Sequence, residues 1–251
     1  MSTAPTEDRQ LSRSRAASVQ MYARVAGVLV LVTTVVGSFG EVYVPSRIIV
    51  PGDATATAAN ITTLNSLFRL GFASYLVEAI CDVALALILY VLLRPVQKRL
   101  SLLAAFFGLV STAFYAFAEL LCFSASLLVG RAEGLGAFSP DQLNALALVL
   151  LKIFLLGAGI SFAFYGVASV LRGYLILRSG YLPRSLGALL MLGGLGFVAK
   201  TLTLVLAPAC SSNALLFPMF PAAVYLMVWL LAKGVDVRKW EERAAANGGI
   251  V

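Results

Sequence analysis

The segment LGFASYLVEAICDVALALILYVLL, residues 70–93, is apolar over most of its length and has only two charged residues, Glu78 and Asp82. An α-helix needs about 20 consecutive apolar residues to cross the hydrocarbon core of a bilayer, so this segment is long enough to be a transmembrane helix. Five further segments have the same character: residues 22–44, 100–129, 142–171, 185–207 and 214–233. The sequence therefore predicts an all-α fold, a polytopic integral membrane bundle of six transmembrane helices.

The composition of the whole chain also indicates lipid as its surroundings. Of its 251 residues, 60% are hydrophobic and 12% are charged, whereas soluble domains carry about 25% charged residues. The net charge of +7 comes from short Lys and Arg clusters between apolar segments. No continuous basic face results, which argues against nucleic-acid binding. The chain has no histidine, which excludes histidine-ligated haem or zinc and a Ser-His nucleophile. We expect the lipid bilayer as a partner, with no cofactor and no metal site.

The distribution of Lys and Arg predicts the orientation of the bundle. Fourteen of the nineteen fall in or directly beside alternate connections, namely the N-terminal tail with Arg24, the 94–99 loop, the 172–184 loop and the C-terminal segment with Lys233. Three lie on the opposite side: Arg47, Arg69 and Arg131. Cytoplasmic loops of membrane proteins are enriched in Lys and Arg, so we expect both termini in the cytoplasm, with a bacterial inner membrane as the location. The predicted organisation is a cytoplasmic tail (1–20), the six-helix bundle (21–234) and a second cytoplasmic tail (235–251).

Two connections contain signals for the start of a helix. Asp53 follows Pro51-Gly52 and precedes an Ala-rich stretch, so it is predicted to cap a helix. The run Ser139-Pro140-Asp141-Gln142 has a Ser at the N-cap, a Pro at N1 and a Gln at N3, the pattern of a capping box. The Gly-rich run 193–196 lies within a predicted span and indicates close helix packing.

The connection from Arg172 to Arg184 alternates Arg with aromatic and aliphatic residues. Interfacial Tyr and Arg side chains hold segments at the level of the lipid headgroups, so we expect this loop to lie on the membrane surface. The alternative is that the same surface docks a protein partner.

Several stretches resemble a known family: residues 52–61 (GDATATAANI), 89–96 (LYVLLRPV), 173–175 (GYL) with 178–183 (RSGYLP), and 229–234 (WLLAKG). They occur in order along most of the chain and are similar to the bacterial uncharacterised membrane proteins of domain-of-unknown-function family 4386. The resemblance implies a polytopic membrane fold. It implies no activity and no catalytic residue.

Six ionisable residues lie inside the predicted helices: Glu41, Glu78, Asp82, Glu119, Lys152 and Lys200. A charge near the middle of the bilayer costs about 2.5–3.5 kcal/mol on insertion scales, so these residues should face the interior of the bundle. Counting along each predicted helix places all six between the outer surface and the midplane. We therefore expect one polar cavity in the outer half, with the two lysines as counter-charges of the acids.

Helical spacing places several of these residues on shared faces. Glu78 and Asp82 are one turn apart, and Tyr115 is one turn before Glu119. Tyr115 therefore joins the candidate residues. With four acids and two lysines, at most two neutral pairs form, which leaves two carboxyl groups as candidates for binding a cation or a proton.

Three functions fit this pattern. The first is binding or translocation of a small solute, cation or proton through the cavity. The second is a non-catalytic sensor or accessory subunit whose buried charges only hold the helices in register. The third is an intramembrane enzyme acting on lipid-linked substrates, for which no catalytic motif is present.

Overall fold

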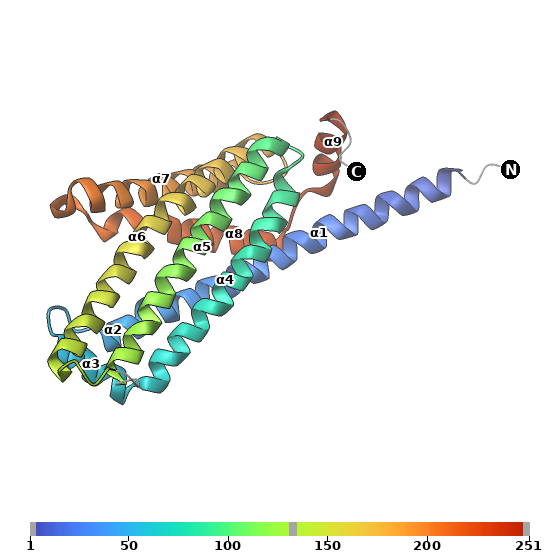
Figure 1. The fold of residues 1–251 in the computed structure, drawn as a ribbon. Helices are drawn as coiled ribbons and strands as arrows, with labels where there is room; N and C mark the ends of the chain where they lie inside the picture. The colour runs from blue at the N-terminus through green and yellow to red at the C-terminus, as the bar shows by residue number, and fades with distance from the viewer. Residues whose placement is uncertain (1–3, 131–134, 248–251) are drawn as a thin grey trace.

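The computed structural model describes residues 4–130 and 135–247, and their side chains from residue 17 onward. This part of the chain contains helices and no strands (Figure 1). The helices are α1 (Ala4–Gly37), the π-helix η1 (Ser38–Tyr43), α2 (Val44–Ile48), α3 (Ala54–Thr63), α4 (Asn65–Leu93), α5 (Lys98–Val129), α6 (Pro140–Ser179), α7 (Arg184–Leu206), the 3-10 turns η2 (Pro208–Cys210) and η3 (Asn213–Leu216), α8 (Met219–Ala232) and α9 (Val237–Ala246).

Six of these segments are long and apolar enough to cross a membrane, which confirms the predicted number of spans. They cover Ala17–Ile48, Asn65–Leu93, Lys98–Val129, Pro140–Ser179, Arg184–Leu206 and Asn213–Ala232. Large apolar side chains such as Ile80, Leu87 and Phe117 are exposed on their outer faces. A water-facing surface would not tolerate so much exposed apolar area. The chain is a multi-pass membrane protein.

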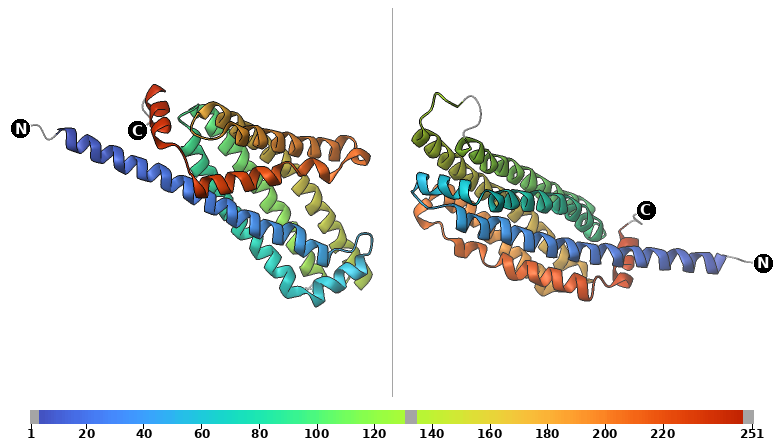
Figure 2. Two further views of the ribbon diagram at one scale, coloured as in Figure 1. Left: turned by 180° about the vertical axis from the view of Figure 1, so that it is seen from behind. Right: turned by 90° about the horizontal axis from the view of Figure 1, so that it is seen from below.

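The six spans form a ring. Each spanning helix packs on its neighbours in sequence, in the order α1, α4, α5, α6, α7 and α8, and α8 returns to pack against α1. In Figures 1 and 2, α4, α5 and α6 run side by side, whereas α7 and α8 form a hairpin inclined to them. A ring of six helices has an interior that no helix fills, and the candidate site lies there.

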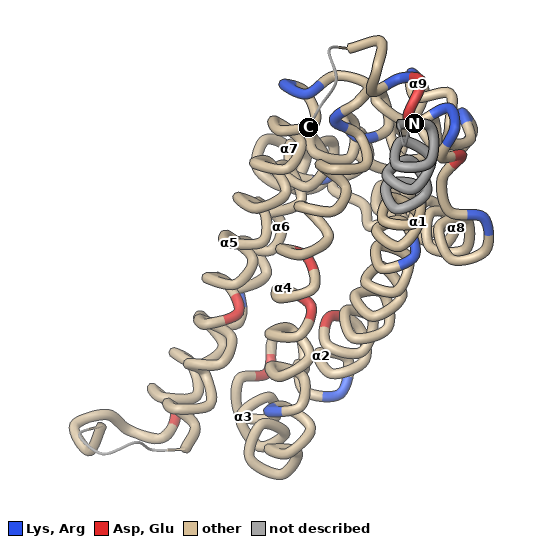
Figure 3. Tube along the Cα trace, turned by 90° about the vertical axis from the view of Figure 1, so that its right-hand side faces the viewer, with Lys and Arg blue, Asp and Glu red and all other residues tan. Residues whose placement is uncertain are grey.

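The two ends of the ring differ. At the terminal end, α4, α6 and α8 end, α5 and α7 begin, and both α1 and α9 lie close by (Figure 1). The opposite end, with α2, α3 and the turns η2 and η3, is called the distal end below. Figure 3 shows most Lys and Arg at the terminal end. That the terminal end faces the cytoplasm stays a prediction.

Local sequence signals set several helix boundaries. The Asp53 carboxylate accepts a hydrogen bond from the backbone N–H of Ala56, as expected of an N-cap. Ser139 and Gln142 form the predicted capping box at the start of α6. Pro218 ends the short η3 region and precedes α8, so the distal part of the sixth span is not regular α-helix. The predictions for Asp53 and for residues 139–142 are confirmed.

Two helices extend beyond their predicted bounds, and the predicted 172–184 loop is wrong. Helix α1 begins at Ala4, within the predicted tail 1–20, because no Gly or Pro interrupts residues 6–26. Helix α6 continues to Ser179 and ends at Gly180, whose φ of 76° is a left-handed cap. Residues 172–179 are therefore the last turns of a span, and the connection to α7 consists only of residues 180–183.

Glycines bring α6 and α7 into direct backbone contact. A Cβ atom added to Gly166 would lie 2.5 Å from the carbonyl oxygen of Gly194, and one on Gly194 would meet the Gly166 oxygen at the same distance. Gly173 and Gly187 face each other in the same way. Small residues at such positions let membrane helices approach closely. The predicted packing role of the 193–196 glycines is confirmed.

The terminal end is held by side chains that bind the last carbonyl groups of α4. The Leu92 oxygen accepts two hydrogen bonds, from the Tyr181 hydroxyl (2.7 Å) and the Trp240 indole N–H (3.0 Å). Asn247 donates to the Pro95 oxygen at 2.7 Å. The last carbonyls of a helix have no partner within it, and here the α6–α7 loop and α9 supply partners.

Candidate functional site: a central polar cavity

A cavity of about 220 Å³ lies inside the ring and is lined by residues from all six spans. Its walls are mostly aliphatic and aromatic, with charged groups from α4, α6 and η1 and hydroxyl groups from α1, α5 and α6. A ligand site of this kind, concave and largely apolar with a few polar groups, is what membrane and soluble bundles commonly form between helices.

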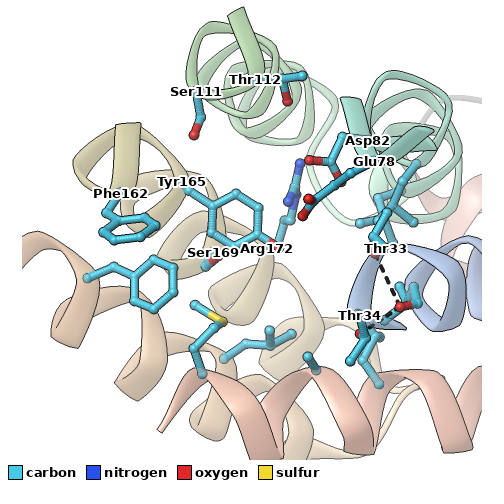
Figure 4. A pocket seen from close by; sticks show the side chains of 18 of the residues that line it. Thr33, Thr34, Glu78, Asp82, Ser111, Thr112, Phe162, Tyr165, Ser169 and Arg172 are labelled. Atoms are coloured by element: carbon cyan, nitrogen blue, oxygen red, sulfur yellow. Dashed lines mark hydrogen bonds between the residues drawn. The ribbon is translucent and has the colours of Figure 1, made fainter. Parts of the chain in front are cut away.

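Four charged side chains line the cavity: Glu41, Glu78, Asp82 and Arg172. Figure 4 shows Glu78 and Asp82 projecting from α4 toward Arg172 of α6. The ion pairs formed by the described residues all lie on α9 and its N-cap. The charged groups of the cavity therefore face one another without closing into direct ion pairs.

Arg172 is the residue that sequence reasoning missed, because it was assigned to a loop. Its side chain is 8% exposed and turns into the bundle. Gly108 of α5 leaves the room that it occupies, since a Cβ there would lie 2.6 Å from Arg172 Nη2. A signal existed: Ser161, Tyr165 and Ser169 line the cavity at four-residue spacing, and Arg172 continues the same face of α6.

Glu41 reaches the cavity from the π-helix η1. A π-turn widens a helix by one residue and is frequent at functional sites. Here the carbonyl oxygen of Gly40, in the same turn, accepts a hydrogen bond of 2.6 Å from the Tyr75 hydroxyl of α4. The Glu41 side chain is exposed. Because it lines the cavity, part of its exposed surface faces the cavity.

Glu78 lies against α1 at a position where α1 has no side chain. A Cβ on Gly37 would come within 2.8 Å of Glu78 Oε1. The other carboxyl oxygen, Oε2, is buried and has no hydrogen-bond partner among the described residues. Glu78 itself lines the cavity, so its carboxyl group has an unused acceptor position that an occupant can reach once the side chain turns toward it.

Tyr115 lines the cavity on α5 and lies beside the carboxyl groups of both Glu41 and Glu119. Glu119, one turn further toward the distal end, is only 3% exposed and is not part of the cavity wall. Neither of its carboxyl oxygens forms a hydrogen bond of ordinary length and angle in the described part of the chain, although the Tyr115 hydroxyl lies beside them.

The two lysines do not join the acids. Lys152 is exposed on α6 and Lys200 donates a hydrogen bond of 2.9 Å to the Ser211 hydroxyl in the distal turns. Neither lines the cavity. Their side chains are long enough to reach a polar surface from within a span. The cation that faces the acids of the cavity is therefore Arg172 and not a lysine.

The depth of the cavity follows from the bounds of α4. Helix α4 begins at Asn65, not near residue 70, so Glu78 is at its midpoint and Asp82 is one turn closer to the terminal end. Arg172 and Ile176 extend the wall further in that direction. Glu41, toward the distal end of the first span, also lines the cavity, so the cavity extends to both sides of the middle of the bundle. Its predicted position in the outer half stays a prediction.

Comparison with known proteins places the chain in a family. The family described as domain of unknown function (DUF4386) matches residues 25–234. An uncharacterised protein of Archaeoglobus fulgidus is 28% identical over 160 residues, which cover 62% of this chain and 78% of the relative. No solved structure matches. Since the match includes all six spans in whole or in large part, the chain belongs to the DUF4386 family of membrane proteins.

Proposed function

We propose that this protein binds a small solute in the central cavity and carries it across the membrane. The observation that carries the proposal is that Glu78, Asp82 and Arg172 face an open space of about 220 Å³ and are not closed into ion pairs. Ionisable residues inside a membrane are costly, and those that face a cavity generally mark the path of a substrate or ion. If the buried charges only held the helices in register, each charged side chain would contact its partner directly.

The alternative of a sensor or accessory subunit that docks a partner through residues 172–184 has less support. Arg172, Leu175, Ile176, Tyr181 and Leu182 are all buried within the protein. The exposed side chains that remain there are those of Arg178 and Arg184, with Tyr174 and Leu177 half-buried. No observation in the described residues favours an intramembrane enzyme.

The test is access of water to the cavity. Thr34→Cys and Ser169→Cys, in a chain whose three native cysteines are replaced, put thiols on the cavity wall. Leu87→Cys is the control, because Leu87 is 62% exposed on the lipid-facing surface. A charged methanethiosulfonate reagent should modify both cavity thiols but not the control.

The same modification, measured in vesicles that expose one or the other side of the membrane to the reagent, distinguishes a carrier from a sensor. Modification from either side of the membrane is expected of a carrier with alternating access. Modification from one side only would favour the sensor. Cavity thiols as unreactive as the control would refute the proposal.

A further inference from the structure

The cavity has two unlike walls. In Figure 4, Glu78 and Asp82 lie on the α4 side, and Phe162 and Tyr165 of α6 lie on the other side, with Arg172 between them. The ring of Phe197, from α7, packs on both aromatic residues of α6: its centroid is 5.0 Å from that of Phe162 and 5.8 Å from that of Tyr165. All three rings line the cavity.

The charges in the wall are unbalanced. The wall contains three carboxyl groups, from Glu41, Glu78 and Asp82, and one guanidinium group, from Arg172. Arg172 points toward Asp82 and Glu78, and it forms no hydrogen bond or ion pair with another described residue although it is nine-tenths buried. One guanidinium offsets one carboxylate, so an occupant meets an excess of acceptors.

We infer that the solute is a small organic cation, a protonated or quaternary amine on an apolar or aromatic body. This inference rests on the proposed function and names the substrate class of the same cavity. The ammonium group lies near the carboxyl group of Glu78, and the body packs on the rings of Phe162, Tyr165 and Phe197. Carboxylates and aromatic faces are the two groups that bind alkylated ammonium ions in water-poor sites.

The size of the cavity limits the solute. A volume of about 220 Å³ is that of about seven waters at about 30 Å³ each and lies below the roughly 300–1,000 Å³ of sites for drug-sized ligands. The solute is therefore an amine with one ring or a short chain.

Other ions fit the wall less well. In residues 17–130 and 135–247 no three acidic or cysteine side chains gather closely enough to hold a metal ion, and Ca²⁺ or Mg²⁺ needs about six or more oxygen ligands. An anion would bind Arg172 only beside Asp82 and Glu78, which repel it.

Four matched probes test the inference by isothermal titration of the full-length protein in nanodiscs, with empty nanodiscs as the blank. They are phenethylammonium, phenylacetamide, phenylacetate and phenylalanine, which share a benzyl group and differ in charge. We expect phenethylammonium to bind at least about tenfold more tightly than each of the others, a difference of about 1.4 kcal/mol.

Two variants test the acidic and the aromatic wall of the cavity separately, and a third is a control. Glu78→Gln should weaken phenethylammonium about tenfold and leave phenylacetamide unchanged, whereas Phe197→Leu should weaken both. Glu242→Gln, on the exposed face of α9, is the control and should change neither. If Glu78→Gln does not fold, Phe197→Leu and the probe series still decide the question.

Equal or tighter binding of the neutral, anionic or zwitterionic probe, or no binding of phenethylammonium, would overturn the inference. The proposed function is judged separately by the cavity thiols. Reactive thiols with no preference for the cation would leave a carrier of another solute class, and unreactive thiols would refute both.

Discussion

The Leu92 carbonyl oxygen gives the sharpest quantitative prediction, because two side chains from distant segments donate to the same acceptor. Tyr181→Phe removes the hydroxyl donor, and Trp240→Phe removes the indole donor. Each single variant leaves the oxygen with one partner. The double variant leaves it with none, in a residue that is 1% exposed.

The magnitudes follow from that geometry. Loss of one hydrogen bond costs about 0.5–1.5 kcal/mol, so Tyr181→Phe should lower the free energy of unfolding by that amount. Trp240→Phe should cost more, since a buried indole also loses packing atoms, by about 0.8 kcal/mol for each buried methylene equivalent. The double variant should lose a further 1–3 kcal/mol, roughly, because the buried carbonyl is then unsatisfied.

The assay is a double-mutant cycle on unfolding in mixed micelles of a mild detergent and sodium dodecyl sulfate. Trp229→Phe is the matched control, because the buried Trp229 Nε1 has no hydrogen-bond partner among the described residues. That variant should cost packing alone and show no coupling to Tyr181→Phe. A coupling energy between Tyr181 and Trp240 below about 0.5 kcal/mol, the ordinary limit of additivity, would refute the reasoning.

Three further predictions concern single sites. Burial raises the pKa of the Tyr181 phenol above its ordinary value of 10.0, so the folded state holds this proton more tightly than the unfolded chain does. The stability that this difference contributes is complete below pH 10 and declines as the pH rises above 10. Unfolding measured from pH 8 to 11 should show a smaller loss of stability in Tyr181→Phe than in the wild type. Glu119→Met should raise the free energy of unfolding by about 1–3 kcal/mol, because it removes two buried oxygens without partners; a lower melting temperature would mean that the carboxyl group is bonded. Gly166→Ala should cost about 1–3 kcal/mol, because its Cβ would press on the Gly194 backbone, and Gly136→Ala, with nothing within 4 Å, should cost far less.

The sequence by itself determined the spans. Lipid offers the backbone no hydrogen-bond partner, so each crossing must be a helix of about 20 apolar residues whatever its neighbours are. Helix starts at Asp53 and Ser139 were also predictable, because a cap forms between residues three apart in the chain. The spacing of Glu78 and Asp82 likewise placed both on one face of α4.

The cavity was decided by the tertiary structure. Hydropathy shows that a charge lies within or beside a span, but not which way a long side chain turns. Lys152 and Lys200 reach the surface or the distal turns, whereas Arg172, near the end of α6, turns inward. It does so because Gly108, on a different helix, leaves space for the guanidinium group and α4 presents its carboxylates there. Such a match between residues distant in the chain exists only once the ring has closed.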